Sequence, residues 1–102
     1  MVVGVLKLTF KLHGNRSLKG KRSVAASIKR KLRNKFNVAV AETEFQDSHE
    51  TLVLSVVTVA GDYKIAQGRL AKVQTMIDAA SPEEIVDSHV EYFSAETEFT
   101  EG

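Results

Sequence analysis

The 102-residue chain contains no cysteine and no tryptophan, and it has a single proline. Without cysteine, a disulfide-stapled scaffold and thiolate chemistry are both excluded. No apolar run reaches the roughly 18–20 residues that cross a bilayer, and the apolar start at residues 2–6 lacks the leading positive charge of a secretory signal. We therefore predict one soluble, cytoplasmic domain over residues 1–95, followed by an acidic tail over residues 96–102.

Acidic residues are missing from the first 41 positions. This part of the chain holds seven Lys and four Arg, a net charge of +11, whereas residues 42–102 hold three basic and 13 acidic residues, a net charge of −10. Such a division predicts a basic binding surface on an otherwise acidic body. Ion pairing within the molecule, or head-to-tail packing between copies, is the alternative explanation.

Hydrophobic periodicity predicts the fold. Four segments have apolar patterns typical of strands, at residues 2–12, 37–45, 52–60 and 85–95. Two segments have helical periodicity, at residues 18–35 and 63–80, and Ser17 and Asp62 are suited to cap them. The order predicts an α+β, ferredoxin-like βαββαβ fold, with a four-stranded antiparallel sheet in the order 4-1-3-2 and both helices on one face.

The first predicted helix carries the strongest functional signal. Seven basic side chains crowd its first turn and its outward face: Arg16, Lys19, Lys21, Arg22, Lys29, Arg30 and Arg33. Cations at a helix N-terminus oppose the helix dipole, whereas a bound phosphate is stabilised there. We therefore expect this helix to bind the backbone of a nucleic acid, RNA in particular. A solvated face or an acidic protein partner is the alternative.

The sheet face that two helices leave uncovered is the second candidate surface. The strand at residues 52–60 is apolar on both sides, so this face is expected to expose an apolar patch. We expect a homodimer through five residues: Val3, Val5, Leu52, Leu54 and Val56. If the alternation of that strand has the opposite orientation, the exposed set is Val53, Val57 and Val59. A small-ligand pocket on this face is the competing interpretation.

Three segments resemble the YlxP-like family of small bacterial proteins of unknown function: GNRSLKGKR at residues 14–22, FNVAVAE at residues 36–42 and VVGVL at residues 2–6. The resemblance extends to about Tyr92 and implies a ferredoxin-like fold. Family members often lie beside genes for translation initiation factor two and ribosome-binding factor A, which implies a role around the ribosome. The chain departs from the family at Gly20, where a Glu is usual, and at residues 48–50, which replace a more apolar segment.

Motifs of enzymes and metal sites are absent from the sequence. Residues 13–17 occupy the place of the anion-cradling loop of acylphosphatases, which share this fold, but lack its pattern of glycines, glutamine and arginine. The three His are isolated, and no glycine-rich loop precedes a nucleotide-binding Lys. We therefore expect a non-enzymatic protein without cofactor or metal that binds RNA or the ribosome. The alternative is a regulatory or assembly module that binds an acidic protein or a small ligand.

Overall fold

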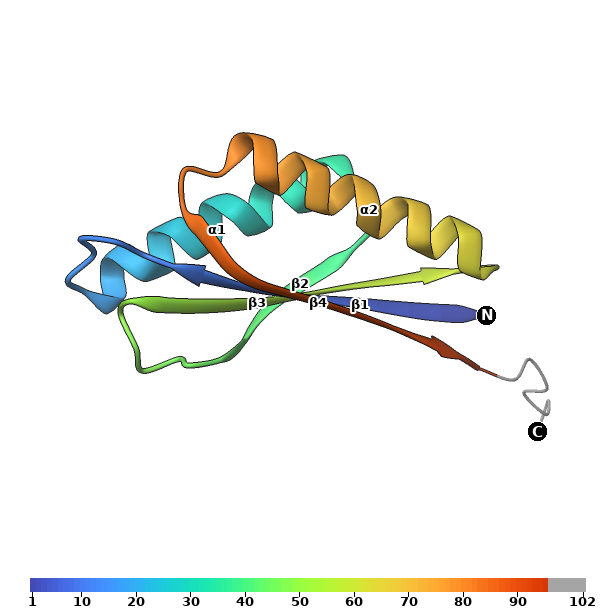
Figure 1. Cartoon of the computed structure of the whole chain (residues 1–102), viewed down its shortest axis with the longest axis horizontal. Coiled ribbons are helices and arrows are strands. Elements are labelled where there is room, and N and C mark those ends of the chain that lie inside the picture. The colour runs from blue at the N-terminus through green and yellow to red at the C-terminus, as the bar shows by residue number, and fades with distance from the viewer. Residues whose placement is uncertain (96–102) are drawn as a thin grey trace.

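The computed structural model describes residues 1–95, and the acidic segment at residues 96–102 lies outside them, so the predicted division into domain and tail stays a prediction. Its elements are β1 (Val2–Lys11), α1 (Leu18–Lys35), β2 (Ala39–Glu44), β3 (Thr51–Ala60), α2 (Tyr63–Ala80) and β4 (Glu84–Ser94). The strands form one antiparallel sheet in the order β2-β3-β1-β4, with both helices on the same face (Figure 1). This is the predicted order read from the other edge, and the predicted ferredoxin-like fold is confirmed.

The alternation along β1 decides what lies in the core. Leu6, Leu8 and Phe10 are at most 3% exposed and face the helices, whereas the residues between them are half-buried on the other face. Ile28 of α1 and Val73 of α2 belong to the same buried cluster. Because each such side chain contributes about 1.5–3 kcal/mol when it leaves water, this single apolar layer is the main stabilising force.

The apolar residues of β3 that were expected at the interface point to the helices and not to the open face. Leu52, Leu54 and Val56 are completely buried and belong to the core cluster beneath the helices. Leu54 lies directly opposite Leu8 across the β1–β3 ladder, and residues opposite each other in a sheet point to the same face. The expectation that these three residues line the open face is therefore wrong. The β3 residues on the open face are Thr51, Val53, Ser55, Val57 and Val59.

Candidate nucleic-acid interface

The helix α1 begins and ends where its sequence predicts. Ser17 is its N-cap, and the Ser17 hydroxyl accepts a hydrogen bond from the Gly20 N–H at 3.0 Å. At the other end, the Phe36 N–H donates to the Leu32 carbonyl at 2.8 Å. Four residues of α1 are buried, namely Lys21, Ala25, Ile28 and Leu32, and the rest of the helix surface is exposed or half-exposed. The outward face is therefore available to a partner along the whole helix.

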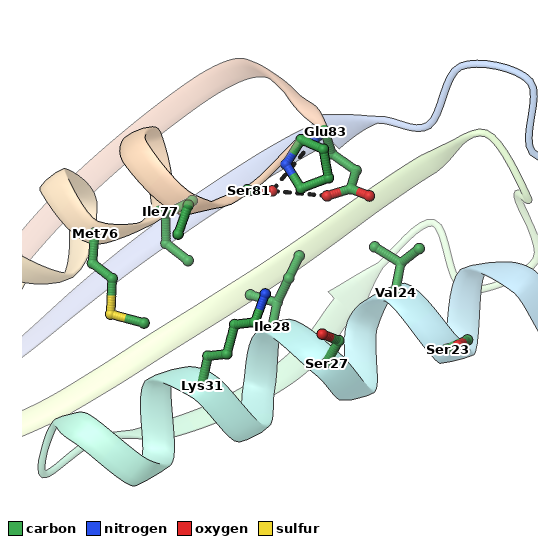
Figure 2. Close-up of a pocket in the computed structure, with 11 residues that line it drawn as sticks. Ser23, Val24, Ser27, Ile28, Lys31, Met76, Ile77, Ser81 and Glu83 are labelled. Atoms are coloured by element: carbon green, nitrogen blue, oxygen red, sulfur yellow. Dashed lines mark hydrogen bonds between the residues drawn. The ribbon is translucent and has the colours of Figure 1, made fainter.

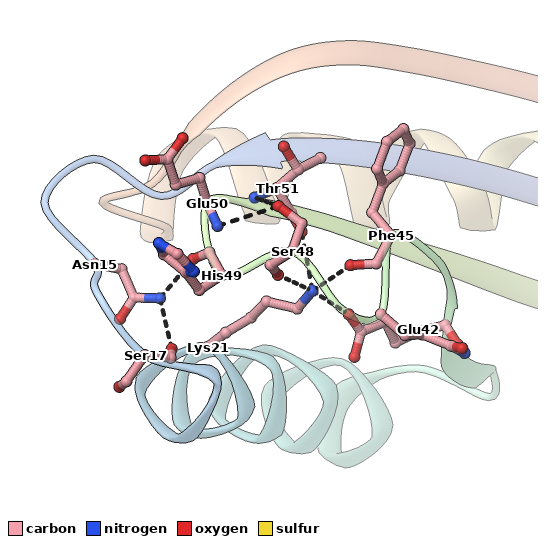
Figure 3. Close-up of polar contacts among 10 residues, drawn as sticks. Asn15, Ser17, Lys21, Glu42, Phe45, Ser48, His49, Glu50 and Thr51 are labelled. Carbon is pink, nitrogen blue, oxygen red and sulfur yellow. Dashed lines mark hydrogen bonds and ion pairs between the residues drawn. The ribbon is translucent and has the colours of Figure 1, made fainter.

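Lys21 is not part of that face. Lys21 is 1% exposed, and its ammonium lies 2.7 Å from the Glu42 carboxylate (Figure 3). The same ammonium donates to the carbonyl oxygens of Phe45 at 2.6 Å, Ser48 at 2.5 Å and Thr51 at 3.0 Å. A charge this buried is held by its partners and cannot reach a phosphate. The prediction that Lys21 binds nucleic acid is therefore wrong, and its role is to fasten the β2–β3 loop to α1.

Asn15 makes a second fastening between the start of α1 and the same loop (Figure 3). Its side-chain amide donates to the Ser17 carbonyl at 2.9 Å and to the His49 carbonyl at 2.6 Å. A Cβ atom at position 20 would collide with the Asn15 side-chain oxygen, so Gly20 leaves the room that this contact needs. Gly20, which departs from the usual Glu, thus has a structural reason, because it leaves room for the contact that joins the start of α1 to the β2–β3 loop.

The loop that Lys21 and Asn15 hold contains a strained residue. Phe45 has a φ of 56°, in the left-handed region that residues with a Cβ seldom occupy. Its ring is largely exposed, so burial of the ring does not offset the strain. The Phe45 carbonyl is one of the acceptors of the Lys21 ammonium. The buried charge therefore holds the backbone of the loop in a conformation that the loop sequence by itself disfavours.

The other six predicted cations remain on the surface. Arg16, Lys19, Arg22, Arg30 and Arg33 are exposed, and Lys29 is half-exposed. Within residues 1–95, none of these six forms an ion pair with an acidic side chain. Within the described residues, Arg33 is the one member of this set whose side chain donates a hydrogen bond, from its guanidinium to the Val40 carbonyl at 3.2 Å. The structure therefore brings together along α1 a set of cations whose charge is not neutralised by the part of the molecule described.

The cations of the sheet are paired, in contrast to those of α1. Lys7 lies 2.6 Å from Glu44, and Lys11 lies 3.2 Å from Glu50. The Lys7–Glu44 pair joins β1 to β2 across the intervening β3, on the open face. The hydrogen bond to the Glu44 carboxylate raises the pKa of Lys7 above its ordinary 10.5, and the negative charges of Glu44, Asp87 and Glu91 add to this effect against desolvation.

The substitution Glu44→Gln is expected to lower the pKa of Lys7 towards its ordinary 10.5, because the largest cause of its rise is removed. Titration of the Lys7 side chain by NMR measures this change. Lys11 in the same sample is the internal control, because its partner is Glu50 and not Glu44. A Lys7 titration curve that does not move would contradict the ion pair across the sheet.

A cavity of about 240 Å³ lies between the middle of α1 and the end of α2 (Figure 2). Its walls are apolar where Val24 and Ile28 face Met76 and Ile77, and Lys31 lies at its rim. Glu83 at the far rim accepts a hydrogen bond from the Ser81 hydroxyl at 2.8 Å. The cavity therefore offers apolar surface with one cation and one engaged carboxylate.

Residues 1–95 contain neither a candidate metal site nor a candidate membrane-spanning helix. No group of three or more His, Asp or Glu side chains there could hold a metal ion. No helix in the same range is long and apolar enough to cross a membrane.

Sequence reasoning missed three basic residues on α2. Lys64, Arg69 and Lys72 lie around one hollow together with Lys35 from the end of α1. The signal that could have found them is their isolation, because they are the only basic residues in positions 42–102. Their meeting with Lys35 depends on how the two helices lie on the sheet, which no local pattern shows.

The strand order and the placement of both helices define a ferredoxin-like α+β protein. Within that class, the chain belongs to the family described as "Protein of unknown function (DUF503)", whose model matches residues 3–90. No curated protein is a significant match to its sequence.

Solved structures are similar to this one at low sequence identity, and one of them has a TM-score above 0.5. A putative antibiotic biosynthesis monooxygenase from Deinococcus radiodurans is 16% identical, with a TM-score of 0.51 over 94% of this chain and 93% of that one. SnoaB, a cofactor-independent oxygenase from Streptomyces nogalater, is 18% identical, with a TM-score of 0.48 over 98% of each chain. The designed protein Foldit4 is 11% identical, with a TM-score of 0.49 over 93% of this chain and 98% of that one. At these identities the likeness shows the fold alone.

The expectation that the chain is not an enzyme is overturned by the Deinococcus structure. That expectation rested on missing motifs of acylphosphatases and nucleotide-binding enzymes. A protein described as a monooxygenase has the same fold over nearly the whole of this chain. The absence of motifs that belong to other enzyme classes therefore does not exclude catalysis by this architecture.

Proposed function

We propose that this protein binds the phosphate backbone of RNA through the exposed cations of α1 and its preceding loop. The surface, called here the α1 cationic face, consists of Arg16, Lys19, Arg22, Lys29, Arg30 and Arg33. The observation that carries the proposal is the contrast in pairing. These six cations have no acidic partner within residues 1–95, whereas Lys7 and Lys11 on the sheet are each paired. A polyanion relieves the repulsion within such a surface and releases its own counterions.

The geometry of α1 favours recognition of backbone over recognition of bases. An 18-residue helix is about 27 Å long, enough to follow several phosphates. RNA modules that stack bases on a sheet need exposed aromatics on their first and third strands. The open-face residues of β1 and β3 include none, and the exposed aromatic Phe93 lies on β4. Phosphate contacts position a protein without reading sequence. We therefore expect preference for RNA shape and charge rather than for a sequence.

The cellular setting of the proposal comes from the family resemblance. The segments at residues 14–22 and 36–42 resemble YlxP-like proteins, whose genes often lie beside genes of ribosome function. We propose ribosomal RNA in the cytoplasm as the physiological target on this basis. An acidic protein partner would use the same cations, and the test below distinguishes the two.

The test is RNA binding across a salt series. With four to six phosphate contacts, the plot of log K against log salt concentration should have a slope of about −3 to −5. The double variant Arg22→Gln/Arg30→Gln should flatten this slope by about 1.5 and weaken all RNA sequences alike. Gln has a helix propensity close to that of Arg, so circular dichroism should show an intact fold.

The matched control is Lys7→Gln/Lys11→Gln, which removes the same charge from the opposite layer. It should leave the slope of the RNA titration unchanged. If both double variants behave alike, the effect is one of net charge and the α1 cationic face is not the binding surface. If the wild type does not bind RNA at low salt, the proposal fails in favour of an acidic protein.

We also propose that the apolar half of the open sheet face binds a second copy of the chain. Val59, Val3 and Phe93 form one cross-strand row, and Val57 and Val5 form the next. Val59 on β3 and Phe93 on β4 flank Val3 of β1 and are 53% and 52% exposed. Val53 lies on the same face but is only 1% exposed, and the Lys7–Glu44 pair crosses β3 beside it. The patch is therefore confined to one end of the sheet, where a two-fold contact would cover it.

A further inference from the structure

The few basic residues of the acidic part of the chain gather at one place. Residues 42–102 contain three of them, Lys64, Arg69 and Lys72, and all three lie on α2. Together with Lys35 at the end of α1 they line an open hollow of about 540 Å³ between the two helices. Among residues 1–95, no acidic residue lines this basic hollow, although acidic residues outnumber basic ones 13 to three after position 41. The hollow therefore has a positive charge that no acidic residue of its described lining offsets.

A chain of hydrogen bonds through the buried Thr58 holds the guanidinium of Arg69 in position. Its Nη1 group donates to the Thr58 hydroxyl at 2.5 Å and to the Val59 carbonyl at 3.0 Å. Thr58 is 2% exposed, and its hydroxyl donates in turn to the Asn37 carbonyl at 3.1 Å. A guanidinium that is already fixed on one edge loses little conformational entropy when its other N–H groups bind an anion. These hydrogen bonds therefore preorganise the Arg69 guanidinium to bind an anionic ligand.

Lys64 lies at the N-terminus of α2, where a positive charge lowers the stability of the helix. It lies in the first turn of α2, whose dipole is positive at that end, and no acidic residue shares this turn. The preceding Asp62 is engaged as N-cap, because its carboxylate accepts the Ile65 N–H at 2.9 Å. Within residues 1–95, none of the four cations of the basic hollow forms an ion pair. An anion in the hollow would offset both the dipole and the mutual repulsion.

The basic hollow also has an apolar side. The half-buried Phe36 ring and the Ile65 side chain, which is 49% exposed, line it beside the cations. A phosphate alone would leave this surface in water, whereas a nucleoside attached to the phosphate would cover it. We propose that the basic hollow binds a nucleoside 5′-phosphate, with the phosphate among the four cations and the nucleoside against Phe36 and Ile65. The ligand is either a free mononucleotide or the phosphorylated 5′ end of an RNA, and none of the α1 cationic face takes part.

The first experiment measures binding of adenosine 5′-monophosphate, adenosine and inorganic phosphate to the full chain by calorimetry at low salt. The wild type should bind the monophosphate about tenfold more tightly than either fragment, since each fragment lacks one half of the contacts. The variant Lys64→Gln/Lys72→Gln should lose about tenfold in affinity for the monophosphate. Both residues are exposed, so circular dichroism should show an unchanged fold.

The matched control is Lys7→Gln/Lys11→Gln, which removes two lysines of β1 that do not line the basic hollow. It should keep the wild-type affinity for the monophosphate. Equal losses in both variants, or equal binding of adenosine and its monophosphate, would overturn the assignment. No measurable binding of the monophosphate by the wild type would overturn it as well.

The second experiment separates the two sources of the ligand. Two RNA oligonucleotides of one sequence, with a 5′-phosphate and with a 5′-hydroxyl, are compared on the wild type and on Lys64→Gln/Lys72→Gln. A wild-type preference for the phosphorylated end that this variant loses assigns the hollow to RNA ends. Equal binding of both RNAs, with the monophosphate still bound, assigns it to free nucleotides. The salt dependence of RNA binding by the Arg22→Gln/Arg30→Gln variant tests the α1 cationic face and not the basic hollow. Failure of the RNA-binding proposal and failure of the nucleotide proposal can therefore be distinguished.

Discussion

Replacing Lys21 by Met is expected to destabilise the protein by about 3–5 kcal/mol, since removal of one partner leaves a buried charge uncompensated. The Glu42 carboxylate would lose the ammonium that lies 2.7 Å away, and one of its oxygens has no other partner within residues 1–95. The carbonyls of Phe45, Ser48 and Thr51 would each lose a donor as well. Because a domain of this size has a total stability of about 5–15 kcal/mol, the loss is a large fraction of the whole.

Urea unfolding followed by circular dichroism measures this effect as a shift of the midpoint by more than about 1 M. The control is Lys19→Met, an exposed lysine on the same helix, which should stay within about 0.5 kcal/mol of the wild type. The double variant Lys21→Met/Glu42→Gln should recover part of the loss, because no buried charge remains unpaired. If Lys21→Met unfolds like the wild type, the ammonium does not hold the β2–β3 loop.

Introducing a lysine at Leu54 is expected to abolish the native fold. Leu54 is 0% exposed within the core cluster, and an unpaired ammonium there has no partner and no route to water. The loss in free energy of unfolding should exceed about 4 kcal/mol, as is typical of buried unpaired charges and large core defects. The variant should show the far-ultraviolet spectrum and exchange-broadened NMR signals of an unfolded or loosely packed chain.

Val59→Lys is the matched variant on the other face of the same strand. Val59 is 53% exposed, so the new ammonium lies in water and the fold should persist. If the apolar half of the open face binds a second copy, Val59→Lys should be a monomer in sedimentation experiments under conditions where the wild type is a dimer. A folded Leu54→Lys protein would contradict the observed orientation of β3. A wild type that stays monomeric at high micromolar concentration would refute self-association.

The apolar pattern alone predicted the secondary structure and the topology of the chain. Alternation along β1 and the helical stripe of α1 are local properties, because side-chain direction follows from the period of the element itself. The caps at Ser17 and Asp62 are equally local, since each hydroxyl or carboxylate reaches only the first turn of its own helix. With two helices and four strands in this order, the known rules of connection leave few arrangements.

The face to which each residue of β3 points was decided by the tertiary structure. Apolar residues occur at both parities of this strand, so its own pattern does not distinguish Leu54 from Val57. The β1–β3 register does, because it sets Leu54 opposite the buried Leu8. A one-residue shift in register would exchange the two faces. The interface expected from the sequence was therefore partly wrong for a reason that only long-range pairing could reveal.

The charges of α1 show the same division between what is local and what is not. The amino-acid sequence shows that the helix is basic throughout and that the acidic residues lie elsewhere. The buried position of Lys21, where it holds the β2–β3 loop, depends on the fold, because its four oxygen partners come from residues 42–51. The meeting of Lys35 with Lys64 and Lys72 also depends on the fold, because these residues are brought together by two helices packed on one sheet. The sequence gives the position of each charge along the chain, but the fold determines which residues contact it.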